Sequence, residues 1–256
     1  MIQLKPGIPP STLNKPRKAA DRRRNRSAKT GGLHFERVFS DANIRPFEQT
    51  EWERRTAEIT DDSATVIFKQ ENVEVPKNWS ALATKIAVSK YFYGDIAHGT
   101  DPRKSGRESS VRELIHRVTR TITDWGIADG YFADAEAAET FYDELTWLCL
   151  NQHGAFNSPV WFNVGLYHEY GIGKGAGEGN YFYNRATGKA ERAPTQYEYP
   201  QGSACFIQNV EDTMEDIMRL AKSEAMLFKY GSGTGSDLST LRSTREKLIG
   251  NLRGKS

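Results

Sequence analysis

The clearest helix signal in the chain is a stripe of apolar residues between positions 111 and 125. Its members lie at positions i, i+3, i+4, i+7, i+11 and i+14 and therefore share one face of a helix: Val111, Leu114, Ile115, Val118, Ile122 and Trp125. Ser110 and Glu113 match the capping box that begins a helix, and Gly126 matches the residue type that ends one. This segment is predicted to be an amphipathic helix that serves packing.

The same spacing predicts three more helices. One runs from Ser80, a candidate cap, to about Phe92, and another covers residues 134–152. Pro159 is expected to break the helical run, because proline disfavours helix at the residue before it. The last helix ends at Gly231, and its apolar face consists of Met214, Ile217, Met218, Ala221, Ala225 and Phe228.

Strand signals are shorter and fall between these helices. Residues 64–75 have strand composition, and Pro76 is expected to end the strand. Residues 171–203 are rich in Gly and Tyr and predict an insertion-like loop or hairpin. Residues 205–207, Cys-Phe-Ile, predict a short buried strand. Strands and helices that alternate in this way predict an α/β fold.

Composition excludes several classes of protein. The chain has 256 residues, of which 38% are hydrophobic, enough for a sizeable core. It has no run of 18 apolar residues, so no transmembrane helix or membrane partner is predicted, and no secretory signal is recognisable. Two cysteines cannot form a disulfide framework, so we expect a cytoplasmic location. They also make a metal site unexpected.

Charge is distributed unevenly along the chain. Residues 1–33 carry nine Lys or Arg against one acid, whereas the rest carries 26 Lys or Arg against 32 acids. We interpret residues 1–33 as a disordered basic tail, because it contains too few large apolar residues to fold. Such a tail can contact nucleic acid. A solvated tail is the simpler interpretation, and a nucleic-acid partner is not expected.

The densest glycine stretch covers residues 231–236, Gly-Ser-Gly-Thr-Gly-Ser. Such a stretch lets backbone N–H groups approach a phosphate closely, but it also simply ends a helix. It matches neither a dinucleotide fingerprint nor a P-loop. The residues alone leave both interpretations open.

The two cysteines have different surroundings in the sequence. Cys205 lies at the start of a predicted strand, where it could be a redox group or a small buried hydrophobe. Cys149 lies among leucines in the middle of a predicted helix and is expected in the core. Asp212 and Glu215 are interpreted as a helix-capping pair.

Several segments together resemble the adenosylcobalamin-dependent (class II) ribonucleotide reductases, over about residues 34–248. The segments are Asn78-Trp79-Ser80 with the helix through Tyr91-Phe92, Ala155-Phe156-Asn157-Ser158-Pro159-Val160-Trp161-Phe162-Asn163, Ser203-Ala204-Cys205-Phe206-Ile207-Gln208, Lys229-Tyr230-Gly231-Ser232-Gly233-Thr234-Gly235, and Leu238-Ser239-Thr240-Leu241-Arg242-Ser243. The long loop between Phe162 and Ser203 also resembles the corresponding loop of these enzymes. The resemblance is specific, because both the order of these motifs and the residues within each of them match.

The resemblance implies a fold, a reaction and partners. The fold is α/β: a helical N-terminal region, here residues 34–150 with a short strand segment, followed by a ten-stranded α/β barrel that begins within residues 151–256. The reaction reduces ribonucleoside diphosphates at the ribose 2′-OH by thiyl-radical chemistry, with adenosylcobalamin as cofactor. The implied partners are dNTP and ATP effectors, a thioredoxin-type reductant and a second subunit of a homodimer.

The resemblance also assigns roles to single residues. Cys205 matches the first of two reducing cysteines, and Ser158, Ala204 and Gly233 match substrate contacts. The backbone amides after Gly231 are expected to cradle the diphosphate. Asp212 and Arg242 match positions near an allosteric specificity site, a weaker transfer.

The chain departs from the family pattern in length and in cysteines. The family enzymes are several times longer, and with only Cys149 and Cys205 the radical cysteine and the other redox cysteines are missing. We therefore expect an N-terminal piece of such an enzyme that is inactive alone. The alternative is a stand-alone nucleotide-binding or regulatory module without catalysis.

Overall fold

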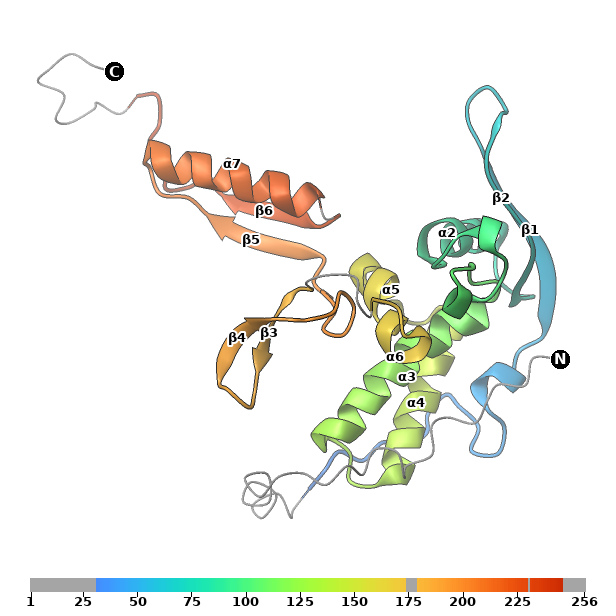
Figure 1. Cartoon of the computed structure of the whole chain (residues 1–256). Coiled ribbons are helices and arrows are strands. Elements are labelled where there is room, and N and C mark those ends of the chain that lie inside the picture. The colour runs from blue at the N-terminus through green and yellow to red at the C-terminus, as the bar shows by residue number, and fades with distance from the viewer. Residues whose placement is uncertain (1–30, 174–178, 230, 246–256) are drawn as a thin grey trace, which may run out of the picture.

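Helices and three two-stranded sheets make up a mixed α/β structure (Figure 1). This computed structural model describes residues 31–173, 179–229 and 231–245. The predicted basic tail therefore lies almost entirely outside the described residues, as does the chain end after residue 245. Among the described helices, none combines the length and the apolar character that crossing a membrane requires.

A long antiparallel hairpin opens the described structure. Strands β1 (Trp52–Thr60) and β2 (Val66–Pro76) pair from Trp52↔Pro76 to Thr60↔Val66. The strand predicted over residues 64–75 is confirmed, including its end at a proline. β1 was not predicted. Val73 and Val75 of β2 are fully buried, so this end of the hairpin forms part of the core.

Two long helices follow, α3 (Val111–Asp129) and α4 (Ala135–Leu150). The capping box at the start of α3 is confirmed, because Ser110 and Glu113 each accept from the expected backbone N–H groups. The predicted stop at Gly126 is wrong, since the helix continues to a left-handed Gly130. Gly126 is instead a packing position: a Cβ there would lie 2.5 Å from the ring of Phe132.

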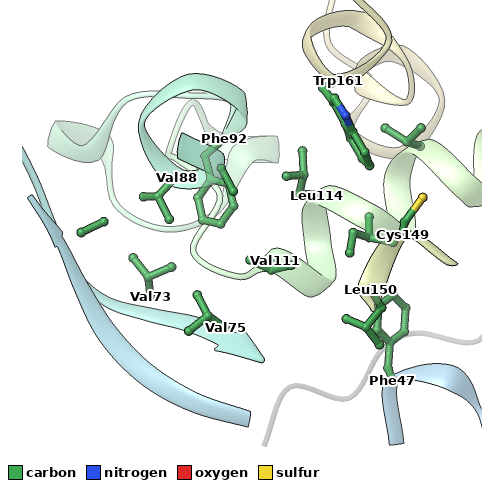
Figure 2. Close-up of a cluster of buried hydrophobic side chains, with 14 of the residues drawn as sticks. Phe47, Val73, Val75, Val88, Phe92, Val111, Leu114, Cys149, Leu150 and Trp161 are labelled. Atoms are coloured by element: carbon green, nitrogen blue, oxygen red, sulfur yellow. The ribbon is translucent and has the colours of Figure 1, made fainter. Parts of the chain in front are cut away.

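The main core lies where the hairpin, the two long helices and the segment before α3 meet. That segment consists of α2 (Ala81–Ile86), capped by Ser80 as predicted, and a π-helical turn, η3 (Ala87–Tyr91). Figure 2 shows buried side chains of β2, η3, α3 and α4 converging, among them Val73, Val88, Val111, Leu114 and Leu150, together with Phe92 and Trp161. Cys149 lies in this cluster, as predicted.

Two short helices, α5 (Ser158–Asn163) and α6 (Leu166–Tyr170), pack on α3. The sequence predicted that Pro159 would break a helix, but α4 has already ended at Leu150, and Pro159 occupies the first turn of a new helix. Proline is favourable there, because a first-turn N–H has no partner within the helix. Asn157 caps α5 by accepting from the N–H of Val160.

The C-terminal part contains a small hairpin and a parallel β-α-β unit. Strands β3 (Tyr181–Asn184) and β4 (Lys189–Arg192) confirm the predicted hairpin within residues 171–203. After them come β5 (Cys205–Asn209), α7 (Met214–Lys229) and β6 (Gly233–Asp237). β5 and β6 are parallel neighbours, and the described residues form no closed barrel.

Three expectations about this unit need correction. β5 is a strand, but it is largely exposed, with Ile207 85% accessible. Thr213, not Asp212, caps α7, because the Thr213 hydroxyl accepts from the N–H of Asp216. The glycine-rich stretch does end the helix, as predicted, because Gly231 follows α7 with φ of 77°; from Gly233 onward, however, it is not an open loop but strand β6, paired with β5.

Candidate functional site

Cys205, Ala204 and Gly233 lie together where β5 and β6 begin. The parallel register pairs Cys205 with Gly233, and the Gly233 N–H donates to the Ala204 carbonyl oxygen at 2.6 Å. Cys205 is a free and exposed cysteine. Three of the predicted site residues are therefore neighbours, although they come from segments on either side of α7.

The glycines of β6 allow this strand to lie close to the side chains of β5. A Cβ atom at Gly233 would lie 3.3 Å from the Cys205 sulfur, and one at Gly235 would lie 3.2 Å from Cδ1 of Ile207. Both contacts are tighter than ordinary packing, so a side chain at either position would crowd β5. Glycine at 233 therefore leaves free space beside the Cys205 thiol. The Gln208 amide further anchors the register by donating to the Thr234 hydroxyl at 2.9 Å.

Two of the backbone amides after Gly231, which were expected to cradle a phosphate, already have partners within the protein. The N–H of Ser232 donates to the Leu227 carbonyl at 3.0 Å, and that of Gly233 donates to Ala204. Both donors are thus used within the β-α-β unit. Side-chain hydroxyl groups become the more important candidates for holding a nucleotide here.

Ser158 begins α5, and its hydroxyl lies 3.1 Å from the Tyr91 hydroxyl. α5 adjoins the segment that leads into β5: the Asn163 amide donates to the Gln201 carbonyl at 3.1 Å, and Gly202 faces Val160. Figure 1 likewise shows α5 close to the start of β5. Ser158 and Cys205 therefore belong to adjoining elements, but the structure gives them no direct contact.

Asp212 and Arg242 form an ion pair away from the thiol, with 3.2 Å between Asp212 Oδ2 and Arg242 Nε. Asp212 follows the end of β5, whereas Cys205 begins that strand. Nearby, the Thr240 hydroxyl donates to the Val210 carbonyl, which ties the chain after β6 to the end of β5. The two weaker site residues thus join each other at the opposite end of the strand pair.

Cys149 offers no chemistry at this site. It is 6% exposed within the helical core, and burial raises the pKa of its thiol to about 12. A thiol with so high a pKa stays protonated and unreactive near neutral pH. Among the described residues, no group of three His, Cys, Asp or Glu side chains could hold a metal ion.

A fully buried ion pair in the described part of the chain was not predicted from the sequence. Arg117 and Glu108 are both fully buried and paired, with 2.7 Å between Nε and Oε1. Arg117 also donates to the carbonyls of Tyr91, Trp161 and Val164, at 3.1, 2.7 and 2.6 Å. We call Arg117, Glu108 and the groups that they bind the Arg117 hub. This hub holds η3 and α5, the two elements that carry Tyr91 and Ser158.

Glu108 completes the hub as an acceptor. It accepts from the Tyr170 hydroxyl at 2.7 Å and from the Tyr93 N–H at 2.7 Å. Burial raises the pKa of Tyr170 well above its usual value, so its hydroxyl remains a donor. A charged pair within a polar stretch usually lies in solvent, so no sequence signal distinguished this one.

A second polar cluster joins α3, α4 and α6. His116 Nδ1 lies 2.7 Å from the Tyr142 hydroxyl, and His116 Nε2 lies 3.9 Å from Glu169. Burial, assisted by the nearby cations Arg120 and Arg103, lowers the pKa of His116 to about 4. His116 is therefore neutral near pH 7 and joins the helices as a hydrogen-bonding group.

Comparison with known proteins agrees with these motifs. Residues 53–152 match the family model described as class II vitamin B12-dependent ribonucleotide reductase, and residues 203–256 match the barrel domain of ribonucleotide reductase. A protein named vitamin B12-dependent ribonucleotide reductase from Rhodopirellula baltica is 59% identical over 223 residues, which cover 86% of this chain. One of the same name from Bradyrhizobium diazoefficiens is 36% identical over 248 residues.

A shorter match involves a vitamin B12-dependent ribonucleoside-diphosphate reductase from Thermoplasma acidophilum, 41% identical over 54 residues. The chain spans about a fifth of the length of the first two relatives, 20% in each case.

Proposed function

Since the chain belongs to the family of class II vitamin B12-dependent ribonucleotide reductases, we propose that it supplies part of the substrate site of an enzyme that reduces ribonucleoside diphosphates to 2′-deoxyribonucleotides. The observation that carries this proposal is the exposed Cys205 thiol paired with Gly233 where β5 and β6 begin. Such an enzyme acts in the cytoplasm, in the synthesis of DNA precursors.

In this proposal Cys205 is one of two reducing thiols. Its proton goes to the departing 2′-hydroxyl group, which leaves as water. The two thiols together give up two electrons and two protons, the ribose carbon gains hydrogen, and the sulfurs join in a disulfide. Cys149 is buried in the helical core, so the second thiol has to come from outside this chain. A thioredoxin-type reductant then restores both thiols.

Ser158, Ala204 and Gly233 are the proposed substrate contacts. Gly233 leaves space beside the thiol, and Ser158 offers a hydroxyl group from the adjoining helix α5. Asp212 and Arg242 are proposed to lie near an effector site for dNTP or ATP in a homodimer. Their ion pair joins the segment after β5 to the segment after β6, and in this proposal an effector binds near it.

The β-α-β unit is proposed to begin a ten-stranded α/β barrel over residues 151–256, preceded by the mainly helical region 34–150 and the basic tail 1–33. Support comes from the parallel pairing of β5 and β6 and from the exposed apolar residues of the unit, such as Ile207 and Phe228, which further strands would cover. Adenosylcobalamin would supply radical chemistry to the complete enzyme. In the described part of the chain, the two-stranded sheet that carries Cys205 leaves the thiol exposed and forms no cavity for a corrin ring around it, so no step of the proposal is assigned to this cofactor.

A chimera tests the proposal within a complete enzyme. The matching segment of the Rhodopirellula baltica relative is replaced by this chain, and dCDP formation from CDP is measured with adenosylcobalamin and dithiothreitol. We expect turnover by the chimera and none by the 256-residue chain alone. Cys205→Ser should abolish turnover but retain CDP binding, whereas Cys149→Ala should remain active. A chimera that binds CDP without turning it over would favour a regulatory module instead.

A further inference from the structure

Tyr91 meets Ser158 at the junction of two elements. It ends the π-helical turn η3, and its hydroxyl oxygen lies 3.1 Å from the Ser158 hydroxyl oxygen. Its ring also packs against α5, with its centroid 5.4 Å from that of Phe162. The phenol is therefore held against α5 through both its ring and its hydroxyl group.

The chemistry of the two hydroxyl groups gives this contact a direction. A serine hydroxyl has one proton and rotates freely, so alone it points at a ligand only part of the time. A phenol is more acidic than an aliphatic alcohol, so Tyr91 is the better donor of the two. When Tyr91 donates, the Ser158 proton remains available for an acceptor oxygen of a ligand.

The Arg117 hub fixes both partners of this contact. Its guanidinium donates to the Tyr91 carbonyl at 3.1 Å and to the carbonyls of Trp161 and Val164 in and after α5. Arg117 is fully buried, so water does not compete for the hydrogen bonds that it donates to the two elements. The wide turn of η3, in which the N–H of Phe92 donates to Ala87, places Tyr91 at the end that faces α5. π-Helical turns often occur at functional sites.

We propose that Tyr91 is a positioning residue that orients the Ser158 hydroxyl group toward a ribonucleoside diphosphate. The inference rests on the proposed function, because that function supplies the ligand. The Gly233 N–H beside Cys205 already donates to Ala204, so a side-chain hydroxyl such as that of Ser158 gains importance as a donor to the nucleotide. Tyr91 itself need not touch the nucleotide, so its effect should depend entirely on Ser158.

A double-mutant cycle in the chimera described above tests this dependence, with CDP affinity measured by calorimetry. Ser158→Ala and Tyr91→Phe each remove one hydroxyl group. We expect Ser158→Ala to weaken CDP binding about tenfold and Tyr91→Phe about threefold, as for loss of one hydrogen bond. In the Ser158→Ala background, Tyr91→Phe should have no further effect. Tyr93→Phe, the same change two residues away, should leave affinity unchanged.

A second measurement reports the contact without a nucleotide. In chain labelled at tyrosine ¹³Cζ, the resonance lost in Tyr91→Phe identifies Tyr91, and Ser158→Ala should shift it. If Ser158→Ala leaves the Tyr91 resonance unmoved, the inference is overturned. It is also overturned if Tyr91→Phe weakens CDP binding in the Ser158→Ala background. The same holds if Ser158→Ala weakens CDP binding but Tyr91→Phe alone does not. If the parent chimera binds no CDP, or its Ser158→Ala variant binds CDP normally, the proposed substrate site itself fails and the positioning role fails with it.

Discussion

Arg117 Nε and Glu108 Oε1 lie 2.7 Å apart, and neither side chain is exposed to solvent. Removing one partner of a buried ion pair leaves the other charge without compensation. We expect Glu108→Gln to lower the free energy of unfolding by about 3–5 kcal/mol. Urea denaturation of the chain measures this loss.

The control for this variant is Lys77→Gln, which breaks the exposed ion pair between Lys77 and Glu51. Exposed pairs contribute little to stability, so the midpoint of unfolding should not change measurably. A Glu108→Gln variant as stable as Lys77→Gln would show that the hub does not hold η3 and α5 together.

Gly165 provides a second test of the same region. It has φ of 87°, and a Cβ atom there would lie 2.4 Å from the Arg117 carbonyl oxygen. Gly130 has φ of 73° but open space around it. Gly130→Ala should therefore cost about 1–2 kcal/mol for the left-handed backbone alone. Gly165→Ala should cost clearly more, because the backbone has to move away from α3. Equal losses in thermal unfolding would contradict the close approach of Gly165 to α3.

The two cysteines should differ sharply in reactivity. At pH 8, a thiol with a pKa of about 12 is ionised in only about one molecule in 10,000. Iodoacetamide should therefore label exposed Cys205 and leave Cys149 unmodified in the folded chain, with both labelled in denaturant. Peptide mass spectrometry identifies the sites. Labelling of Cys149 in native buffer at a rate near that of Cys205 would place it outside the core.

His116 should make the chain lose stability in mild acid. Its folded pKa of about 4 lies below the ordinary value of 6.5, so the unfolded chain binds the proton more readily. The contribution of neutral His116 is complete above about pH 6.5 and is lost as the pH falls toward 4. Because the side chain keeps some contact with solvent, we expect a loss of about 1–2 kcal/mol over this range.

His116→Gln should flatten this part of the stability profile, whereas the same change at exposed His98 should not. Urea unfolding at intervals between pH 7 and pH 4 gives the comparison. Parallel profiles for wild type and His116→Gln would exclude His116 as the titrating group.

Features determined by neighbours in the sequence were the predictable ones. Ser110 and Glu113 lie three positions apart, and the capping box that they form needs no distant partner. The helices over residues 111–129 and 135–150 were found in the same way, from the spacing of their apolar residues. The end of α3 was misplaced, because only the distant packing of Phe132 shows that Gly126 lies inside the helix.

Features determined by distant partners were missed. β1 carries the charged residues Glu53, Arg54, Arg55 and Glu58, and its strand character comes from pairing with β2. β6 is rich in glycine and depends on β5 in the same way. The site residues came from family resemblance, whereas Tyr91 and the Arg117 hub required the structure, because their roles arise from contacts across the chain.

The hub also has a consequence for the order in which the chain folds. Burying Glu108 and Arg117 costs free energy unless their hydrogen-bond partners are already in place. These partners are Tyr170, the Tyr93 N–H and the carbonyls of Tyr91, Trp161 and Val164. Contacts between α3 and α4 are closer in sequence than those that join the hub to Trp161, Val164 and Tyr170, and they can form first. We expect the hub to close after the folding transition state and to open first during unfolding. Ser158 would then lose its orientation while the helical core is still intact.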